Sequence, residues 1–167
     1  MYNRIFINIL IYSSLFIALI MNIMFFPETI QAFKPNFLLL LVLFWIVKEP
    51  RHVGIGHAFV CGLTLDVLIG YTIGVRAFAF SLMAYMLCKT FIRMTTYSML
   101  QQCATILLIS SVGIVVAFWL EHIFGLAMID YHLVLSSVSD AVMWPFLCMI
   151  MGFFYKFKRS PRENLNF

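Results

Sequence analysis

The sequence predicts an all-α integral membrane protein with six transmembrane helices. Of its 167 residues, 63% are hydrophobic and only 11% are charged, and a soluble domain of this size needs a polar surface that this composition cannot supply. Several apolar runs approach the length of roughly 20 residues that crosses a bilayer core. The segments between these runs are short. We therefore expect one membrane domain over residues 1–167, with no separate soluble domain.

The first two expected helices cover residues 5–26 and 34–48. The first run is uncharged, is long for the apolar part of a signal peptide and has no A-x-A-like cleavage site after it, so we expect it to stay in the protein. The second run is short. Pro35 suits its first turn, but its apolar part covers only about 18 Å at the helical rise. To span a membrane it needs Lys34 and Lys48 to reach the two interfaces.

The other four expected helices are separated by a glycine-containing turn at 71–74, a polar stretch at 93–98 and a loop after residue 121. The chain closes with a short basic tail at 156–167. The four helices are expected over residues 53–70, 75–92, 99–121 and 133–155.

The distribution of lysine and arginine predicts the orientation. Six spans with a cytoplasmic N-terminus leave only Lys34 and Arg76 outside, and the other nine of the 11 basic residues inside. A re-entrant second run with an external N-terminus exchanges Arg4 for Lys34 and gives the same ratio. We favour six spans, because a re-entrant loop needs protein around it to satisfy its backbone. Both models place the basic tail in the cytoplasm, so the net charge of +4 reflects topology and anionic lipids and not nucleic acid.

The most informative feature is an aspartate on a stripe of small residues in the third run. A carboxylate inside hydrocarbon costs roughly 2.5–3.5 kcal/mol on insertion scales, so it marks a function or a partner. Small residues at every fourth position let a neighbouring helix approach closely. We therefore expect this face of the helix to be a contact surface. The stripe consists of Gly54, Ala58, Gly62, Asp66 and Gly70.

A second embedded carboxylate, Asp140 in the last run, is expected at the same depth as Asp66, in the outer leaflet. Arg76 is the nearest expected cation, and an Asp66–Arg76 pair would offset part of the desolvation cost of both groups. Three interpretations stay open for these residues: glue between helices of the same chain, a contact site for another membrane protein, and a catalytic or transport site.

The sequence does not favour an enzyme. Two intramembrane aspartates suggest an aspartyl intramembrane peptidase, with one carboxyl as acid and the other as base. The contexts Leu65-Asp66-Val67 and Ser139-Asp140-Ala141 lack the polar motifs of such enzymes. The histidines and cysteines show no metal-ligand spacing. We expect no catalytic residue, no metal and no cofactor.

Three segments resemble the rod shape-determining protein MreD family. They are Phe33-Lys34-Pro35-Asn36 before the leucine-rich second run, the stretch 56–76 with its aspartate, glycine turn and arginine, and Met143-Trp144-Pro145-Phe146. Asp66 and Arg76 match this family position by position. The family accepts an amide at the place of Asp140, which argues against proton transfer there.

The resemblance implies a non-catalytic, multi-pass protein of the bacterial inner membrane that maintains rod shape within the cell-wall elongation machinery. It implies MreC as the direct partner, with the MreB filament, the glycosyltransferase RodA and its penicillin-binding transpeptidase in the wider complex. The fold is also similar to the six-helix S-components of energy-coupling-factor transporters. That similarity leaves an alternative function, a membrane-embedded substrate- or lipid-binding subunit of a transporter-like complex. The short loops and the lack of a polar ligand constellation argue against it.

Overall fold

The computed structural model describes residues 2–23, 34–70, 73–94, 96–123 and 132–158, and the expected all-helical fold is confirmed in them. The last residues of the expected first helix, 24–26, and the tail from residue 159 lie outside the described part. The described residues form six helices, which lie close to the expected ranges. They are α1 (Tyr2–Ile23), α3 (Phe37–Lys48), α4 (Ile55–Ile69), α5 (Val75–Met94), α6 (Met99–Ile123) and α7 (His132–Lys158).

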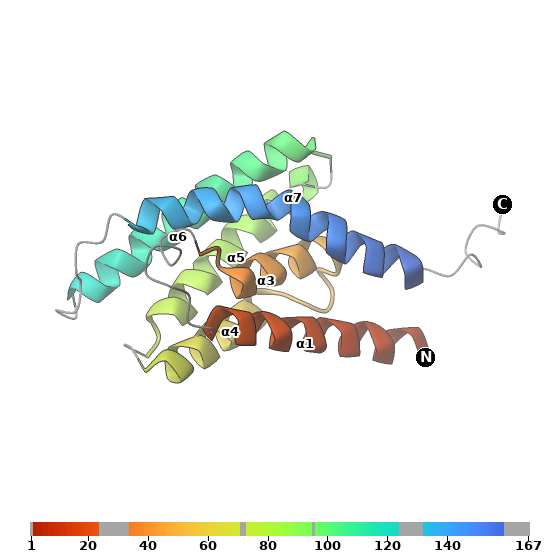
Figure 1. Cartoon of the computed structure of the whole chain (residues 1–167), viewed down its shortest axis with the longest axis horizontal. Helices are drawn as coiled ribbons and strands as arrows, with labels where there is room; N and C mark the ends of the chain where they lie inside the picture. Colours follow the sequence, from red (N-terminus) through yellow and green to blue (C-terminus); the bar gives the residue numbers. More distant parts are fainter. Residues whose placement is uncertain (1, 24–33, 71–72, 95, 124–131, 159–167) are drawn as a thin grey trace.

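Successive helices run in alternating directions. At one end of the bundle Asn22, near the end of α1, donates a hydrogen bond of 2.7 Å to Asn36 at the start of α3. At the other end Tyr155, late in α7, lies beside Glu49 at the end of α3. The start of α1 and the end of α7 therefore lie on the same side of the molecule (Figure 1).

Two of the described helices are long and apolar enough to cross a membrane, namely α6 and the 135–155 part of α7. Three further apolar helices are shorter: 7–23 within α1, α3 and α4. Length and composition thus agree with a membrane protein.

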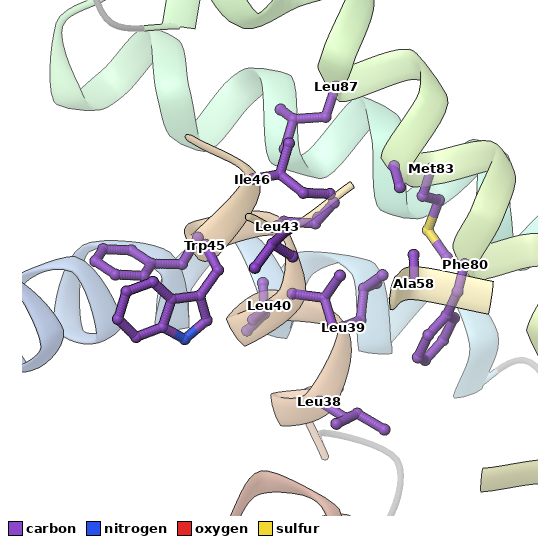
Figure 2. Packing of buried hydrophobic residues seen from close by; sticks show 14 of the residues in the cluster. Leu38, Leu39, Leu40, Leu43, Trp45, Ile46, Ala58, Phe80, Met83 and Leu87 are labelled. Atoms are coloured by element: carbon purple, nitrogen blue, oxygen red, sulfur yellow. The ribbon is translucent and has the colours of Figure 1, made fainter. Parts of the chain in front are cut away.

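The short helix α3 lies at the centre of the bundle. It packs against α1, α4, α5 and α7, and Figure 2 shows its side chains pointing toward several of these neighbours. Its buried residues are Leu38–Leu40 and Val42–Ile46. They lie on all sides of the helix, as expected for a helix that is surrounded by protein. At about 18 Å it is shorter than the roughly 30 Å of a hydrocarbon core. Its neighbours, and not lipid, enclose it.

Local signals set both ends of α3. Asn36 is the N-cap, and its side chain accepts a hydrogen bond of 3.4 Å from the N–H of Leu39. Lys48 lies in the last turn, where a cation is favourable to the helix dipole. In the second half of the helix, Trp45 Nε1 donates a hydrogen bond of 2.9 Å to Ser14 Oγ of α1. This bond fixes α3 against α1 in the interior.

Helices α4 and α5 form a tight antiparallel hairpin. Gly70 ends α4 in the left-handed conformation, with φ 76°, and its N–H donates to the carbonyl of Asp66 over 3.1 Å. Gly74, just before α5, has φ 103°. Such backbone conformations favour glycine, because it has no Cβ. The hairpin turns the start of α5 back toward the last turn of α4.

Candidate functional site

Asp66 is buried, at 1% exposure, and binds the first turn of the next helix. Its Oδ2 accepts hydrogen bonds from the N–H of Gly74 over 2.9 Å and of Ala77 over 3.2 Å. Its Oδ1 accepts one from the N–H of Arg76 over 3.3 Å. The first N–H groups of a helix have no acceptor within that helix. Asp66 therefore caps α5 from α4, at the positive end of the α5 dipole.

The contact between Asp66 and Arg76 that the structure gives runs through the main chain of Arg76. The sequence led us to expect an ion pair between the two side chains. That ion pair stays a prediction. The contacts of the carboxylate with main-chain donors partly compensate its burial in the same way as a cation would.

Asp140 plays a parallel part in α7. It is also 1% exposed, and its Oδ1 accepts a hydrogen bond of 2.7 Å from the N–H of Asn36, the N-cap of α3. Its Oδ2 accepts one of 2.7 Å from the hydroxyl of Ser110 in α6. One carboxylate thus joins α7 to the start of α3 and to α6. Neither Asn36 nor Ser110 was among the candidate residues. An asparagine directly before an apolar run is an N-cap signal and could have identified Asn36.

The end of α1 joins the same polar region. Lys34, which precedes α3, donates from its ammonium to the carbonyl of Asn22 over 2.5 Å, and a cation there is favourable to the α1 dipole. The carbonyl of Lys34 accepts from the hydroxyl of Ser136 in α7 over 3.3 Å. Burial lowers the pKa of the Lys34 ammonium, and the positive charge of Arg76 lowers this pKa further. Lys34 and Arg76, the two basic residues expected outside the cytoplasm, therefore both lie at this end of the bundle.

The small-residue stripe is covered by the chain itself along its middle. Ala58 and Gly62 are buried, and Ala58 lies near Phe80 and Met83 of α5 (Figure 2). A Cβ added at Gly62 would lie 2.6 Å from Cα of Ala77. The middle of the stripe is thus the contact between α4 and α5.

The two ends of the stripe differ from its middle. Gly70 is exposed and serves the turn, while a Cβ added at Gly54 would meet nothing within 4 Å. None of the other described helices therefore approaches Gly54 closely.

A surface groove of about 750 Å³ lies between α1 and α4, with Leu38 of α3 in its lining. Its walls include Phe16 and Leu19 of α1, and Val60 and Thr64 of α4. The hydroxyl of Thr64 bonds carbonyls of its own helix, at 3.0 Å and 2.8 Å. The lining is mostly apolar. This groove, called the α1–α4 groove below, can accept an apolar group from the side.

These features define a class of protein. Apolar helices surround a short buried helix, and two buried carboxylates cap the starts of helices inside the bundle. This is the construction of a polytopic helical membrane protein, since helix ends inside hydrocarbon need acceptors from protein. Among the described residues, no group of three or more His, Cys, Asp or Glu is placed to hold a metal ion.

The family follows from comparison with known proteins. The model of the family "rod shape-determining protein MreD" matches residues 3–154, so the chain belongs to the MreD family. Rod shape-determining protein MreD of Haemophilus influenzae is 28% identical over 141 residues, which cover 84% of this chain and 87% of that protein. No solved structure matches the chain. The resemblance seen in the sequence is confirmed, and with it a generally non-catalytic family that determines rod cell shape.

Proposed function

We propose that this protein is a non-catalytic scaffold of the cell-wall elongation machinery in the bacterial inner membrane. It maintains rod shape by binding MreC and by linking MreB filaments to the peptidoglycan synthases, RodA and its transpeptidase partner. The family match over residues 3–154 carries the proposal. The bonding of both buried carboxylates supports it, because each already binds the start of a helix and neither is placed to act on a substrate.

The proposed topology has six passes with both ends in the cytoplasm. The alternating helix directions and the nine-to-two distribution of the 11 basic residues support it. A reporter enzyme that works only in the periplasm, fused ahead of Arg4, should be inactive. The same reporter fused after residue 121 should be active. Activity of the N-terminal fusion would refute this topology.

The α1–α4 groove is the proposed contact for the transmembrane helix of MreC. The groove is open, apolar and lies along two helices, as expected for a surface that accepts a helix. The middle of the small-residue stripe, the surface first expected, is occupied by α5. A partner helix would therefore reach α4 on its other face, at Val60 and Thr64.

Filling the groove tests this contact. Val60 is 57% exposed, so Val60→Trp should fold normally and obstruct only a partner. Leu108→Trp is the matched control, because Leu108 is 64% exposed on α6, outside the groove. We expect Val60→Trp to accumulate normally and to copurify at least about tenfold less MreC than the parent. Rod-shaped cells that carry this variant should become round. Equal MreC recovery with both variants would refute the groove as the contact.

The alternative function is a ligand-binding subunit, and the size of the groove supports this alternative. About 750 Å³ falls within the range of roughly 300–1,000 Å³ typical of small-molecule sites. Such sites also have a few convergent polar groups, and the mostly apolar lining makes a lipid chain the best candidate. Native mass spectrometry distinguishes the two functions. A small molecule retained by the parent protein and lost in Val60→Trp, with MreC binding intact, would favour the alternative.

A further inference from the structure

Helix α7 contains a proline in its interior. The ring of Pro145 removes one main-chain donor and crowds the carbonyl of Ala141, four residues earlier. Prolines are the commonest cause of helix bends. In Figure 1 the two halves of α7 run in different directions. Pro145 therefore divides α7 into two segments that meet at an angle.

The two segments are held very differently. Before the proline, Ser137, Asp140 and Trp144 are buried, and Asp140 binds both α3 and α6. Within residues 146–155, Leu147 is the buried residue, while Phe146, Met149, Ile150, Phe153 and Phe154 are exposed. The first segment is anchored in the core. The second touches the core along one narrow face.

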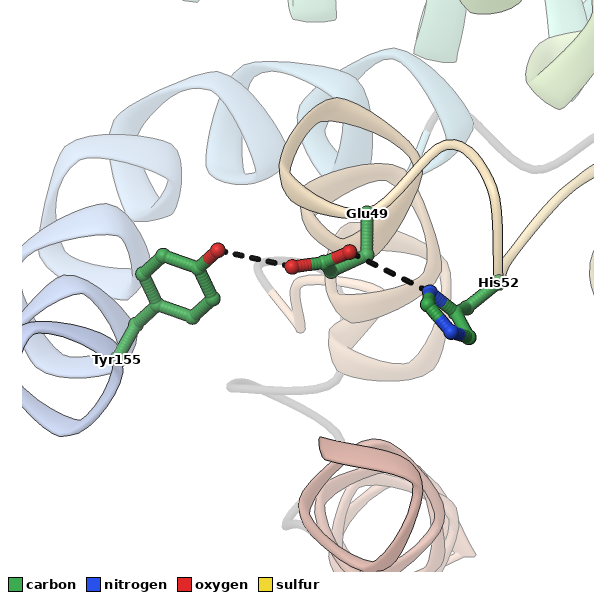
Figure 3. Close-up of polar contacts among 3 residues, drawn as sticks. All are labelled: Glu49, His52 and Tyr155. Atoms are coloured by element: carbon green, nitrogen blue, oxygen red, sulfur yellow. Dashed lines mark hydrogen bonds and ion pairs between the residues drawn. The ribbon is translucent and has the colours of Figure 1, made fainter. Parts of the chain in front are cut away.

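A polar contact holds the far end of the second segment. The hydroxyl of Tyr155 donates a hydrogen bond of 2.8 Å to Oε1 of Glu49, directly after α3 (Figure 3). The other oxygen of Glu49, Oε2, lies 3.3 Å from Nδ1 of His52. The N–H of His52 also donates to the carbonyl of Glu49 over 3.0 Å, which closes a tight turn. The acceptor of the Tyr155 bond is thus fixed by the turn that joins α3 to α4.

The contact is well placed to control an angle. Tyr155 lies about 15 Å beyond Pro145 at the helical rise. A single bond at that distance resists rotation about the proline more effectively than the same bond close to it. Asp140 on one side of Pro145 and Tyr155 on the other both bind the ends of the same central helix, α3.

We propose that residues 146–158 form a hinged arm, with Pro145 as the hinge and the Tyr155–Glu49 hydrogen bond as a clasp that holds the arm against α3. The arm carries Lys156 and Lys158 and continues into the basic tail. Opening the clasp moves the arm while the first segment of α7 stays in place.

Distances between spin labels test the arm in the full-length protein, with the four native cysteines replaced by alanine. One label pair joins Ile9→Cys of α1 to Phe153→Cys of the arm, and a reference pair joins Ile9→Cys to Val138→Cys of the first segment. All three positions are exposed. Phe153 lies about 12 Å beyond Pro145, so a rotation of about 20° moves it by about 4 Å.

Tyr155→Phe should shift or broaden the distance to the arm by about 4 Å and leave the reference distance unchanged. Glu49→Gln keeps an oxygen acceptor and should behave like the parent, whereas Glu49→Leu should behave like Tyr155→Phe. Tyr85→Phe, an exposed tyrosine on α5, is the matched control and should change neither distance. Adding Pro145→Ala to Tyr155→Phe should restore a narrow distribution.

Two results would overturn the proposal. In the first, Tyr155→Phe leaves the arm distance as it is in the parent. In the second, the reference distance changes as much as the arm distance, so that α7 loosens as a whole and does not bend at Pro145.

Discussion

Adding a single methyl group at Gly62 tests the central contact of the fold. In Gly62→Ala the new Cβ would lie 2.6 Å from Cα of Ala77, 2.8 Å from its nitrogen and 2.8 Å from the carbonyl oxygen of Arg76. All three are main-chain atoms, so no side chain can rotate away. Carbon atoms in contact prefer about 3.5–4.0 Å, so α4 and α5 must move apart by about 1 Å.

The movement also breaks the cap on α5. The hydrogen bonds from Ala77 and Arg76 to Asp66 measure 3.2 Å and 3.3 Å, and an added displacement of about 1 Å takes both beyond bonding distance. Overpacking costs about 1–3 kcal/mol, and hydrogen bonds to a charged group contribute about 1.5–3 kcal/mol each. The better helix propensity of alanine returns up to about 1 kcal/mol. Since the first two effects overlap, we expect a net loss of about 2–4 kcal/mol.

Thermal melting of the purified protein in detergent measures this loss. At about 2–4 °C per kcal/mol, Gly62→Ala should melt at least about 4 °C below the parent. Gly56→Ala on the same helix and Gly152→Ala on α7 are matched controls, because an added Cβ there meets nothing within 4 Å. Both should melt at the parent temperature or slightly above. If Gly62→Ala did the same, the close approach of α4 and α5 would be refuted.

Three further predictions use the same melting assay. Asp66→Asn replaces an acceptor with a donor beside main-chain N–H groups and should cost about 2–4 kcal/mol. Arg76→Ala keeps those N–H groups bonded and should cost less, so a larger loss for Arg76→Ala would contradict the cap. Asp140→Asn should cost less than about 1.5 kcal/mol, because its amide can accept from one partner and donate to the other, and an equal loss at both aspartates would contradict this. Trp45→Phe should lower the free energy of unfolding by about 0.5–1.5 kcal/mol, and adding Ser14→Ala to it should lower it little further. If the losses of the two single variants added fully in the double variant, the two side chains would not be bonded.

The sequence predicted the six helices well, because long apolar runs and the glycine and proline positions between them are local signals. It also singled out Asp66 and Asp140 inside apolar runs, and both are buried in the structure. It did not predict what they bind. The cation Arg76 was the visible partner for Asp66, whereas main-chain donors leave no trace in a sequence. They become partners only because Gly70 and Gly74 turn the start of α5 back onto α4.

The short second run shows a different limit. Its length gave a helix too short to cross a bilayer core. The distribution of lysine and arginine fitted a snorkelling span and a re-entrant loop equally well, and only the need to satisfy the backbone favoured the span. The structure gives a short helix that packs against α1, α4, α5 and α7. The signal was present, since a helix that is apolar on all sides is a buried one. Which helices surround it depends on contacts distant in the sequence.

The two aspartates solve one physical problem in two ways. Both α3 and α5 begin with N–H groups that have no acceptor within the helix, and each helix start is bound by a buried carboxylate of another helix. A cap from the same segment would complete the helix but would not place it. A carboxylate from a neighbouring helix does both, because the bond that satisfies the start of one helix also fixes its position against another. Three main-chain donors bind the two oxygens of Asp66, which suits a carboxylate and not an amide. Asp140 accepts one hydrogen bond from a main-chain N–H and one from the rotatable hydroxyl of Ser110, an arrangement that an amide can also satisfy.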